Sequence, residues 1–134
     1  MTDRRQQGAE NRDWGHEAEG LAAEYFLKEG YTIRERNWKM NRLEVDLILE
    51  KDRQIVFVEV KARKRGPTSH DPVTAVDFTK RRHLVNAADV YLRRLPVLYQ
   101  YRFDIVTFTG TRDDYEMRHY PDAFIPLANQ YKKR

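Results

Sequence analysis

Residues 43–48 read Leu-Glu-Val-Asp-Leu-Ile and residues 57–61 read Phe-Val-Glu-Val-Lys, and these two stretches decide the fold. Both are rich in Val, Leu, Ile and Phe, the residue types that favour strands. The polar residues 51–53 separate them and supply a turn. We therefore expect an antiparallel hairpin whose strands cover residues 43–49 and 54–61.

Charged residues interrupt both of these apolar strands. Side chains alternate between the two faces of a strand, so Glu44 and Asp46 share one face and Glu59 and Lys61 share another. Val45 is expected to point to the opposite face, together with the other apolar residues at alternate positions. Buried strands seldom carry charge without a reason.

A two-residue turn at residues 52–53 fixes the register of the hairpin, because each residue then pairs with the one equally far beyond the turn. This register places Asp46 opposite Glu59 and Glu44 opposite Lys61. Two carboxylates that face each other destabilise a sheet unless a cation, a proton or a nearby lysine compensates. The alternative is an ordinary solvated sheet face with cross-strand ion pairs.

A divalent cation is the simplest compensating group. Closely spaced carboxylate oxygens suit Mg²⁺ or Mn²⁺, which usually keep several waters for exchange with a phosphate. Such an ion activates water for phosphodiester hydrolysis, and Lys61 is suited to orient that water or to stabilise developing negative charge. The chain has no cysteine, which excludes thiolate zinc sites. The four histidines lack the spacing of zinc ligands: His16, His70, His83 and His119.

The rest of the chain supplies helices and further strands around the hairpin. We expect a helix from about Asp13 to Gly30, a strand over 31–37, a loop over 66–72, a helix from Asp77 to Arg94, and strands over 101–109 and 115–120. The order α-β-β-β-α-β-β predicts an α/β fold with a mixed sheet flanked by helices. A single domain is expected over residues 13–126, with a flexible tail over 1–12 and a basic tail over 127–134.

Composition limits the partners. The chain has 134 residues, of which 25 are Lys or Arg and 21 are Asp or Glu, giving a formal net charge of +4. This balance is compatible with a polyanion and equally with a solvated surface. No stretch has the length and apolarity of a membrane span, so we expect no membrane partner and a cytoplasmic location.

The spacing of the charged residues resembles that of a known nuclease superfamily. Glu19 on the first helix, followed by Glu44-Val45-Asp46 and by the Phe-Val-Glu-Val-Lys stretch at 57–61, resembles the PD-(D/E)XK nucleases. The chain is most similar to the YraN-like family of bacterial proteins, from about Gly15 to Phe124. Two positions depart from the family pattern, because Leu43 stands where Gly usually precedes Glu-x-Asp and Ala18 stands where Gly often precedes the helix Glu.

The resemblance implies a restriction-endonuclease-like fold, shared with Holliday-junction resolvases, and a nuclease dependent on Mg²⁺ or Mn²⁺. It implies that Asp46 and Glu59 are metal ligands, that Lys61 is the catalytic lysine and that Glu19 is the acidic residue of the first helix. The implied partner is nucleic acid, DNA before RNA, with branched DNA among the implied substrates. A homodimer is also implied, since cutting two strands requires two sites.

Other charged residues have accessory roles in this hypothesis. Glu44 and Lys80 are expected to border the site, with a snorkelling lysine as the alternative for Lys80. Residues 63–65, which are Arg63, Lys64 and Arg65, are expected to contact a phosphate backbone, and a solvated strand end is the alternative. Two rival functions remain open: a nucleic-acid-binding or partner-binding module that kept the fold without turnover, and an interaction domain with a polar sheet face.

Overall fold

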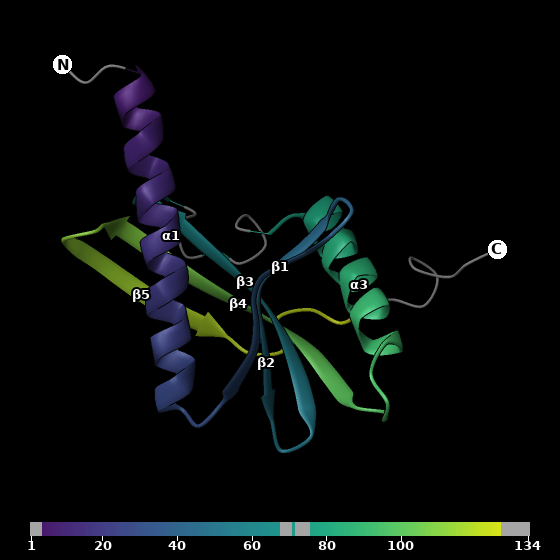
Figure 1. Ribbon diagram of the computed structural model, residues 1–134. Coiled ribbons are helices and arrows are strands. Elements are labelled where there is room, and N and C mark those ends of the chain that lie inside the picture. Colours follow the sequence, from purple (N-terminus) through teal and green to yellow (C-terminus); the bar gives the residue numbers. More distant parts are fainter. Residues whose placement is uncertain (1–3, 68–70, 72–75, 127–134) are drawn as a thin grey trace.

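The structure, a computed structural model, describes residues 4–67, 71 and 76–126. Its elements follow the order α1 (Arg4–Lys28), β1 (Thr32–Met40), β2 (Leu43–Lys51), β3 (Gln54–Arg63), α3 (Phe78–Arg93), β4 (Gln100–Thr111) and β5 (Asp114–Tyr120). This arrangement, visible in Figure 1, confirms the expected α/β class and the order α-β-β-β-α-β-β. No helix in the described part of the chain has the length and apolarity needed to cross a membrane.

The five strands form one mixed sheet in the order β1-β2-β3-β4-β5. β3 and β4 are parallel, whereas the other three neighbouring pairs are antiparallel. A parallel pair needs a crossover connection, and here α3 lies in that connection. The apolar strand β3 therefore occupies the centre of the sheet, as its sequence predicts.

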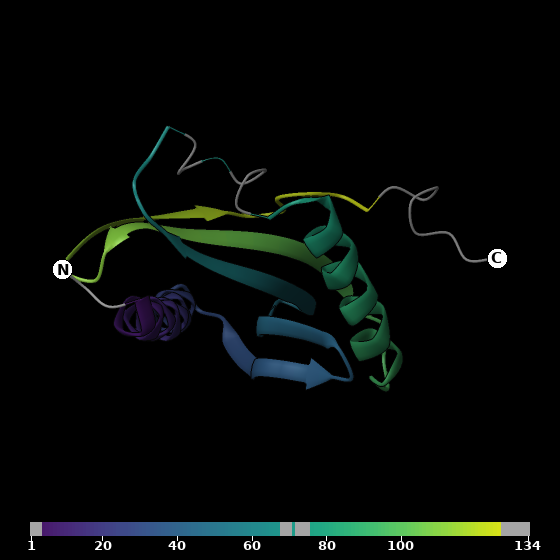
Figure 2. The ribbon, with the colours of Figure 1, turned by 90° about the horizontal axis from the view of Figure 1, so that it is seen from above.

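Each face of the sheet is covered by one helix. Figure 2 shows α1 and α3 on opposite sides of the strands. On the α1 side, Ala22 and Phe26 pack against Val58 and Val60 in one buried cluster. On the α3 side, a second buried cluster joins the helix to β2, β3 and β4, and it includes Leu84, Ala88, Ile48, Phe57 and Phe103. The sheet is thus buried on both faces, which leaves little room for uncompensated charge in its interior.

The turn between β2 and β3 has the two-residue form expected from the sequence. Asp52 and Arg53 both have positive φ, 53° and 63°, as a type I′ turn requires. The pairing that follows this turn runs from Lys51↔Gln54 to Leu47↔Val58 and confirms the predicted register over that range.

The pairing of β2 with β3 ends at Leu47, before it reaches the acidic residues. Asp46 does not continue the ladder with Glu59; its Oδ2 accepts a hydrogen bond from the Val60 N–H at 2.8 Å. The predicted pairing of Glu44 with Lys61 is likewise wrong, because the β2–β3 ladder ends at Leu47↔Val58, and Glu44 pairs only on the other edge of β2, with Lys39 of β1. A side-chain carboxylate has taken the place of a main-chain acceptor, and the strands separate there.

β2 also changes face at this point. Val45 packs in the cluster on the α3 side, whereas Leu47 packs in the cluster on the α1 side, although both occupy odd positions in the strand. The prediction that Val45 shares a face with Leu47 was therefore wrong. Asn37 in β1, next to the residue paired with Val45, has φ of 50°, which marks the same local irregularity. Asp46 lies between Val45 and Leu47, where β2 changes face.

The helices differ from prediction mainly at the N-terminus. α3 begins as expected, with Asp77 as N-cap accepting a hydrogen bond from the Lys80 N–H at 2.9 Å. α1 begins at Arg4, so the flexible tail expected over residues 1–12 is helical from residue 4 onward. Gln, Ala, Glu and Arg are good helix formers and extend a packed helix without an apolar stripe of their own. This extension passes beyond the sheet in Figure 1. The tail expected over 127–134 and most of the 66–72 loop lie outside the described residues.

Candidate active site

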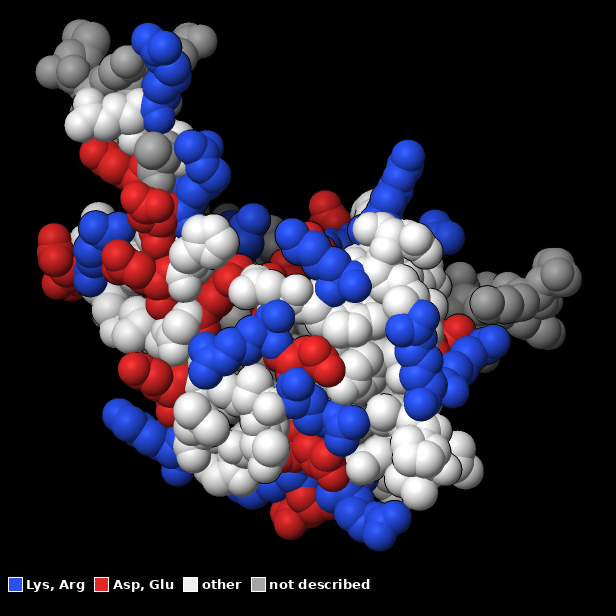
Figure 3. Space-filling view, in the orientation of Figure 1, with Lys and Arg blue, Asp and Glu red and all other residues white. Residues whose placement is uncertain are grey.

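The opening between β2 and β3 brings together carboxylates from three elements. Asp46 lies at the opening, and its carboxylate is within hydrogen-bonding reach of Glu19 from α1 and of Glu59 from β3. Lys80 from α3 approaches from the other face of the sheet. Acidic and basic side chains mix on the molecular face between α1 and α3 (Figure 3). Because the β2–β3 ladder ends here, charged side chains from both faces of the sheet approach one another. An intact sheet would keep them on separate faces.

Glu59 is the most deeply buried carboxylate of this group. The residue is 9% exposed, and Lys80 Nζ lies 3.5 Å from its Oε2. Its other oxygen, Oε1, is buried and has no hydrogen-bond donor. An ionised carboxylate with one unsatisfied oxygen is unfavourable in a buried position. Glu59 therefore needs either a proton, which it can donate to Asp46, or a cation.

The electrostatics of the site favour that same conclusion. Burial, followed by the negative charge of Asp46, raises the pKa of Glu59 from 4.5 to about 8, although Lys80 opposes the change. Burial and the Asp46 charge likewise raise the pKa of Glu19 to about 7, against the opposing effect of His16. Burial also raises the pKa of Asp46, even though its hydrogen bond from Val60 favours ionisation. Because these three carboxylates are buried and repel one another, a nearby positive charge would stabilise them.

The donor set fits a hard divalent cation. All three groups present carboxylate oxygens, and Oε1 of Glu59 is a buried acceptor in need of a partner. Across the described residues, no set of three His, Asp or Glu side chains is placed to hold a metal ion together. Mg²⁺ does not require one, since it commonly takes one or two carboxylates and completes its shell with water and phosphate. Asp46 and Glu59 are the residues that would hold the ion.

Lys61 and Glu44 lie at the exposed margin of the site. Lys61 follows Glu59 by two residues on β3 and is exposed, whereas Val60 between them is buried on the α1 side. Glu44 is also exposed, and its charge contributes to the raised pKa of both Glu19 and Asp46. Lys61 therefore offers a solvent-accessible ammonium two residues along β3 from Glu59.

The basic residues that follow Lys61 lead away from the carboxylates. Arg63 and Lys64 line a cavity at the end of β3, whereas Arg65 makes an exposed ion pair with Asp114 at 3.4 Å. The sequence reasoning had not singled out His16, whose Nδ1 lies 3.8 Å from Glu19 Oε1. Its position three residues before Glu19 on a helix was the available signal.

Comparison with known proteins places the chain in a family. Residues 18–108 match the model of "Uncharacterised protein family UPF0102". The chain belongs to the UPF0102 family. A UPF0102 protein of Phocaeicola vulgatus is 36% identical over 118 residues, which cover 88% of this chain and 97% of the relative. A relative from Myxococcus xanthus is 34% identical, covering 90% of this chain and 96% of its own length. One from Syntrophomonas wolfei is 40% identical over 85% of this chain and 99% of its own. UPF0102 membership confirms the resemblance to the YraN-like family.

The raised pKa of Glu59 predicts that Glu59→Gln stabilises the fold at alkaline pH. The folded state holds this proton up to about pH 8, whereas the unfolded chain releases it near pH 4.5, so wild-type stability falls as the pH rises between these values. Gln cannot ionise and avoids this loss. We expect the Tm of the variant to exceed that of wild type by about 3 °C or more at pH 9, and to match it at pH 4.

Thermal melting of both proteins from pH 4 to pH 9 in EDTA measures this difference. Glu24→Gln, an exchange at an exposed position of α1, is the matched control and is expected to leave the Tm unchanged across the range. A constant difference between wild type and Glu59→Gln at every pH would contradict the prediction, because titration of Glu59 would then contribute nothing to stability.

Proposed function

We propose that this protein is a metal-dependent nuclease of the PD-(D/E)XK type, which hydrolyses phosphodiester bonds in DNA or RNA. The observation that carries the proposal is the unsatisfied Oε1 of Glu59, buried beside Asp46 at the point where the ladder opens. Glu19 lies beside Asp46, and Lys61 follows Glu59 by two residues on β3; the resemblance to these nucleases gives both residues a role. A purely structural sheet face has no need for such a costly arrangement of carboxylates.

The roles of the residues follow from their positions. Asp46 and Glu59 would hold Mg²⁺ or Mn²⁺, which supplies a water of lowered pKa and neutralises charge on the scissile phosphate. Lys61 is accessible and would donate hydrogen bonds to a phosphate oxygen or to the attacking water. Glu19, with a pKa of about 7, can accept a proton near neutral pH. Lys80 keeps Glu59 oriented through their 3.5 Å ion pair.

The test of this proposal measures metal binding and cleavage on the same preparation. Mn²⁺ is expected to raise the Tm of wild type more at pH 8.5 than at pH 6, because protons compete with the metal for the carboxylates. Cleavage is expected from a panel of single-stranded, duplex, flap and four-way-junction DNA and single-stranded RNA, and EDTA is expected to abolish it.

The panel also distinguishes the rival functions. A Tm shift with Mn²⁺, together with nucleic-acid binding and no cleavage on any substrate, would replace the nuclease with a binding module on the same fold. If Mn²⁺ shifts no Tm and no nucleic acid binds, the proposal is overturned. The polar sheet face would then be an interaction surface. Gel filtration with light scattering, with and without junction DNA, tests the expected homodimer.

A further inference from the structure

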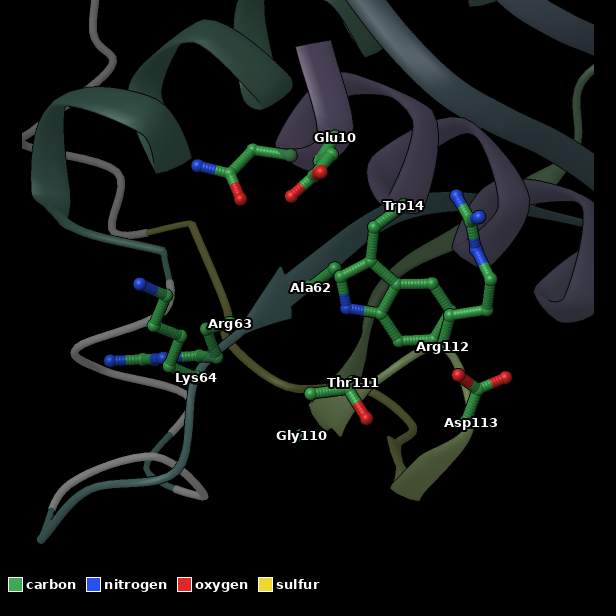
Figure 4. A pocket seen from close by; sticks show the side chains of 10 residues that line it. Glu10, Trp14, Ala62, Arg63, Lys64, Gly110, Thr111, Arg112 and Asp113 are labelled. Atoms are coloured by element: carbon green, nitrogen blue, oxygen red, sulfur yellow. The ribbon is translucent and has the colours of Figure 1, made fainter. Parts of the chain in front are cut away.

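A cavity of about 460 Å³ lies at the end of β3, immediately beyond Lys61. Figure 4 shows its walls, which come from α1 with Glu10 and Trp14, from the end of β3 with Arg63 and Lys64, and from the β4–β5 hairpin. Its volume falls in the range of small-molecule binding pockets, about 300–1,000 Å³. The cavity is separate from the carboxylates, yet it lies on the same strand as Glu59 and Lys61.

Two residues that line the cavity each carry a hydrogen-bond donor without a partner. Trp14 Nε1 and Arg63 Nη1 are both buried, and neither has a hydrogen-bond acceptor. Both groups donate and cannot accept, so only an acceptor can satisfy them. Buried donors are nearly always paired in folded proteins, and two unpaired ones in the wall of one cavity indicate a ligand that carries acceptor atoms.

The indole of Trp14 is held in place by neighbouring aromatic rings. Its centroid lies 6.0 Å from that of Phe108, in an edge-on arrangement, and 5.4 Å from that of Tyr115. In Figure 4 the indole borders the cavity, between the helix and the hairpin. An aromatic ring fixed at the edge of a cavity is suited to contact a nucleic-acid base, and such contacts tolerate any base.

The charges around the cavity match a ligand with two kinds of group. Arg63 and Lys64 provide positive charge on the β3 side, whereas Arg112 forms an ion pair with Glu17 at 2.8 Å. Glu10 supplies a carboxylate elsewhere on the wall. A phosphate can pair with Arg63 and Lys64, and the N–H donors of a base can pair with the Glu10 carboxylate. A bare inorganic anion would use only half of this lining.

We propose that the cavity binds one unpaired nucleotide of the substrate, next to the nucleotide that is cleaved. The phosphate contacts Arg63 and Lys64, and the base lies against Trp14 and accepts its Nε1–H. Arg63 follows Lys61 by two positions on β3, a span of about 7 Å that adjacent phosphates of one strand can bridge. This inference rests on the proposed nuclease function, and it specifies a substrate with a single-stranded segment beside the cleavage site.

The test measures binding in EDTA, so that it is independent of cleavage. A fluorescently labelled duplex with a single-stranded overhang is compared with a blunt duplex. Arg63→Gln and Trp14→Phe are each expected to weaken binding of the overhang substrate about tenfold and of the blunt duplex less than about twofold. Arg93→Gln, which removes an exposed arginine of α3, is the matched control and is expected to change neither affinity.

A second readout follows Trp14 directly. The chain has two tryptophans, so Trp38→Phe leaves Trp14 as the sole indole fluorophore. We expect the overhang substrate to quench this fluorescence and the blunt duplex to leave it unchanged. Equal weakening of both substrates by Arg63→Gln, or no quenching by the overhang, would overturn the inference. Quenching and selective binding by a protein that cleaves nothing would support the nucleotide site and overturn the nuclease alone.

Discussion

Asp46→Asn is expected to lower the rate of metal-dependent cleavage by at least about 10³-fold. The amide removes the negative charge with which Asp46 would hold the ion, and transition-state stabilisation of several kcal/mol is lost with it. The fold should survive, because the Asn carbonyl oxygen can still accept the hydrogen bond that the Val60 N–H donates to Asp46 at 2.8 Å. Circular dichroism and the Tm in EDTA check the fold of the variant.

Lys61→Ala extends the same prediction to a residue that the fold does not need. The lysine is exposed, so its removal is expected to leave stability within about 0.5 kcal/mol of wild type while cleavage falls by about 10²- to 10³-fold. Binding of Mn²⁺ should persist in this variant, since the carboxylates are intact. Lys28→Ala, at an exposed position in the last turn of α1, removes the same charge and is expected to retain full activity.

Both variants are purified beside wild type and assayed on whichever substrate of the panel is cleaved. Equal cleavage by wild type, Asp46→Asn and Lys61→Ala would show that the activity belongs to a contaminant. Loss of cleavage in Lys28→Ala as well would point to non-specific electrostatics. Either result would remove the support that the site geometry gives to a nuclease.

The hairpin shows how far the sequence alone predicts this site. Local chemistry fixed the turn at residues 52–53, and the turn fixed the register as far as Leu47. Beyond that residue the alternation rule failed, because the Asp46 carboxylate accepts the Val60 N–H and β2 changes face. A side chain that replaces a main-chain hydrogen bond leaves no periodic signature. Asp46 and Glu59 are close together in either arrangement, since they lie on the neighbouring strands β2 and β3.

The cavity could not be predicted from the sequence, for a different reason. Its lining comes from Trp14, from residues 63–64 and from residues 110–113, which are distant in sequence and meet only through tertiary packing. The sequence predicts that Arg63 and Lys64 contact a phosphate backbone, with a solvated strand end as the alternative, but no sequence pattern connects them with Trp14. The first nine residues of α1 were also missed, because residues 4–12 have helix propensity but no apolar period.

A buried polar network between α1 and strands β4 and β5 leads to the largest stability prediction. Asp104 is fully buried and accepts hydrogen bonds from Arg102 at 2.8 and 3.0 Å and from the Asp122 N–H at 2.9 Å. His119 Nε2 lies 2.7 Å from Asp104 Oδ2, and His119 Nδ1 lies 2.9 Å from the Tyr25 hydroxyl of α1. The tautomer protonated at Nε2 satisfies both contacts. The network therefore ties α1 to β4 and β5.

Asp104→Ala is expected to lower the free energy of unfolding by about 3–5 kcal/mol, because it leaves Arg102 and His119 without their buried acceptor. The fall in Tm should be on the order of 10 °C or more. Burial opposes ionisation of Asp104, but hydrogen bonds from His119, Arg102 and Asp122 outweigh it and lower its pKa. Its contribution is therefore complete above the unfolded pKa of about 3.9 and is lost as the pH falls further.

Urea denaturation at pH 7 and at decreasing pH measures this loss. Asp89→Ala is the matched control, because Asp89 forms an ion pair of 3.2 Å with Arg93 at the surface of α3, where such pairs contribute about 0–1 kcal/mol. Equal destabilisation by the two substitutions would contradict the prediction. So would an undiminished difference between wild type and Asp104→Ala at acidic pH, because protonation should already have weakened the network in wild type. A large loss confined to Asp104→Ala would show that this network, and not surface charge, anchors the helix that carries Glu19 and Trp14.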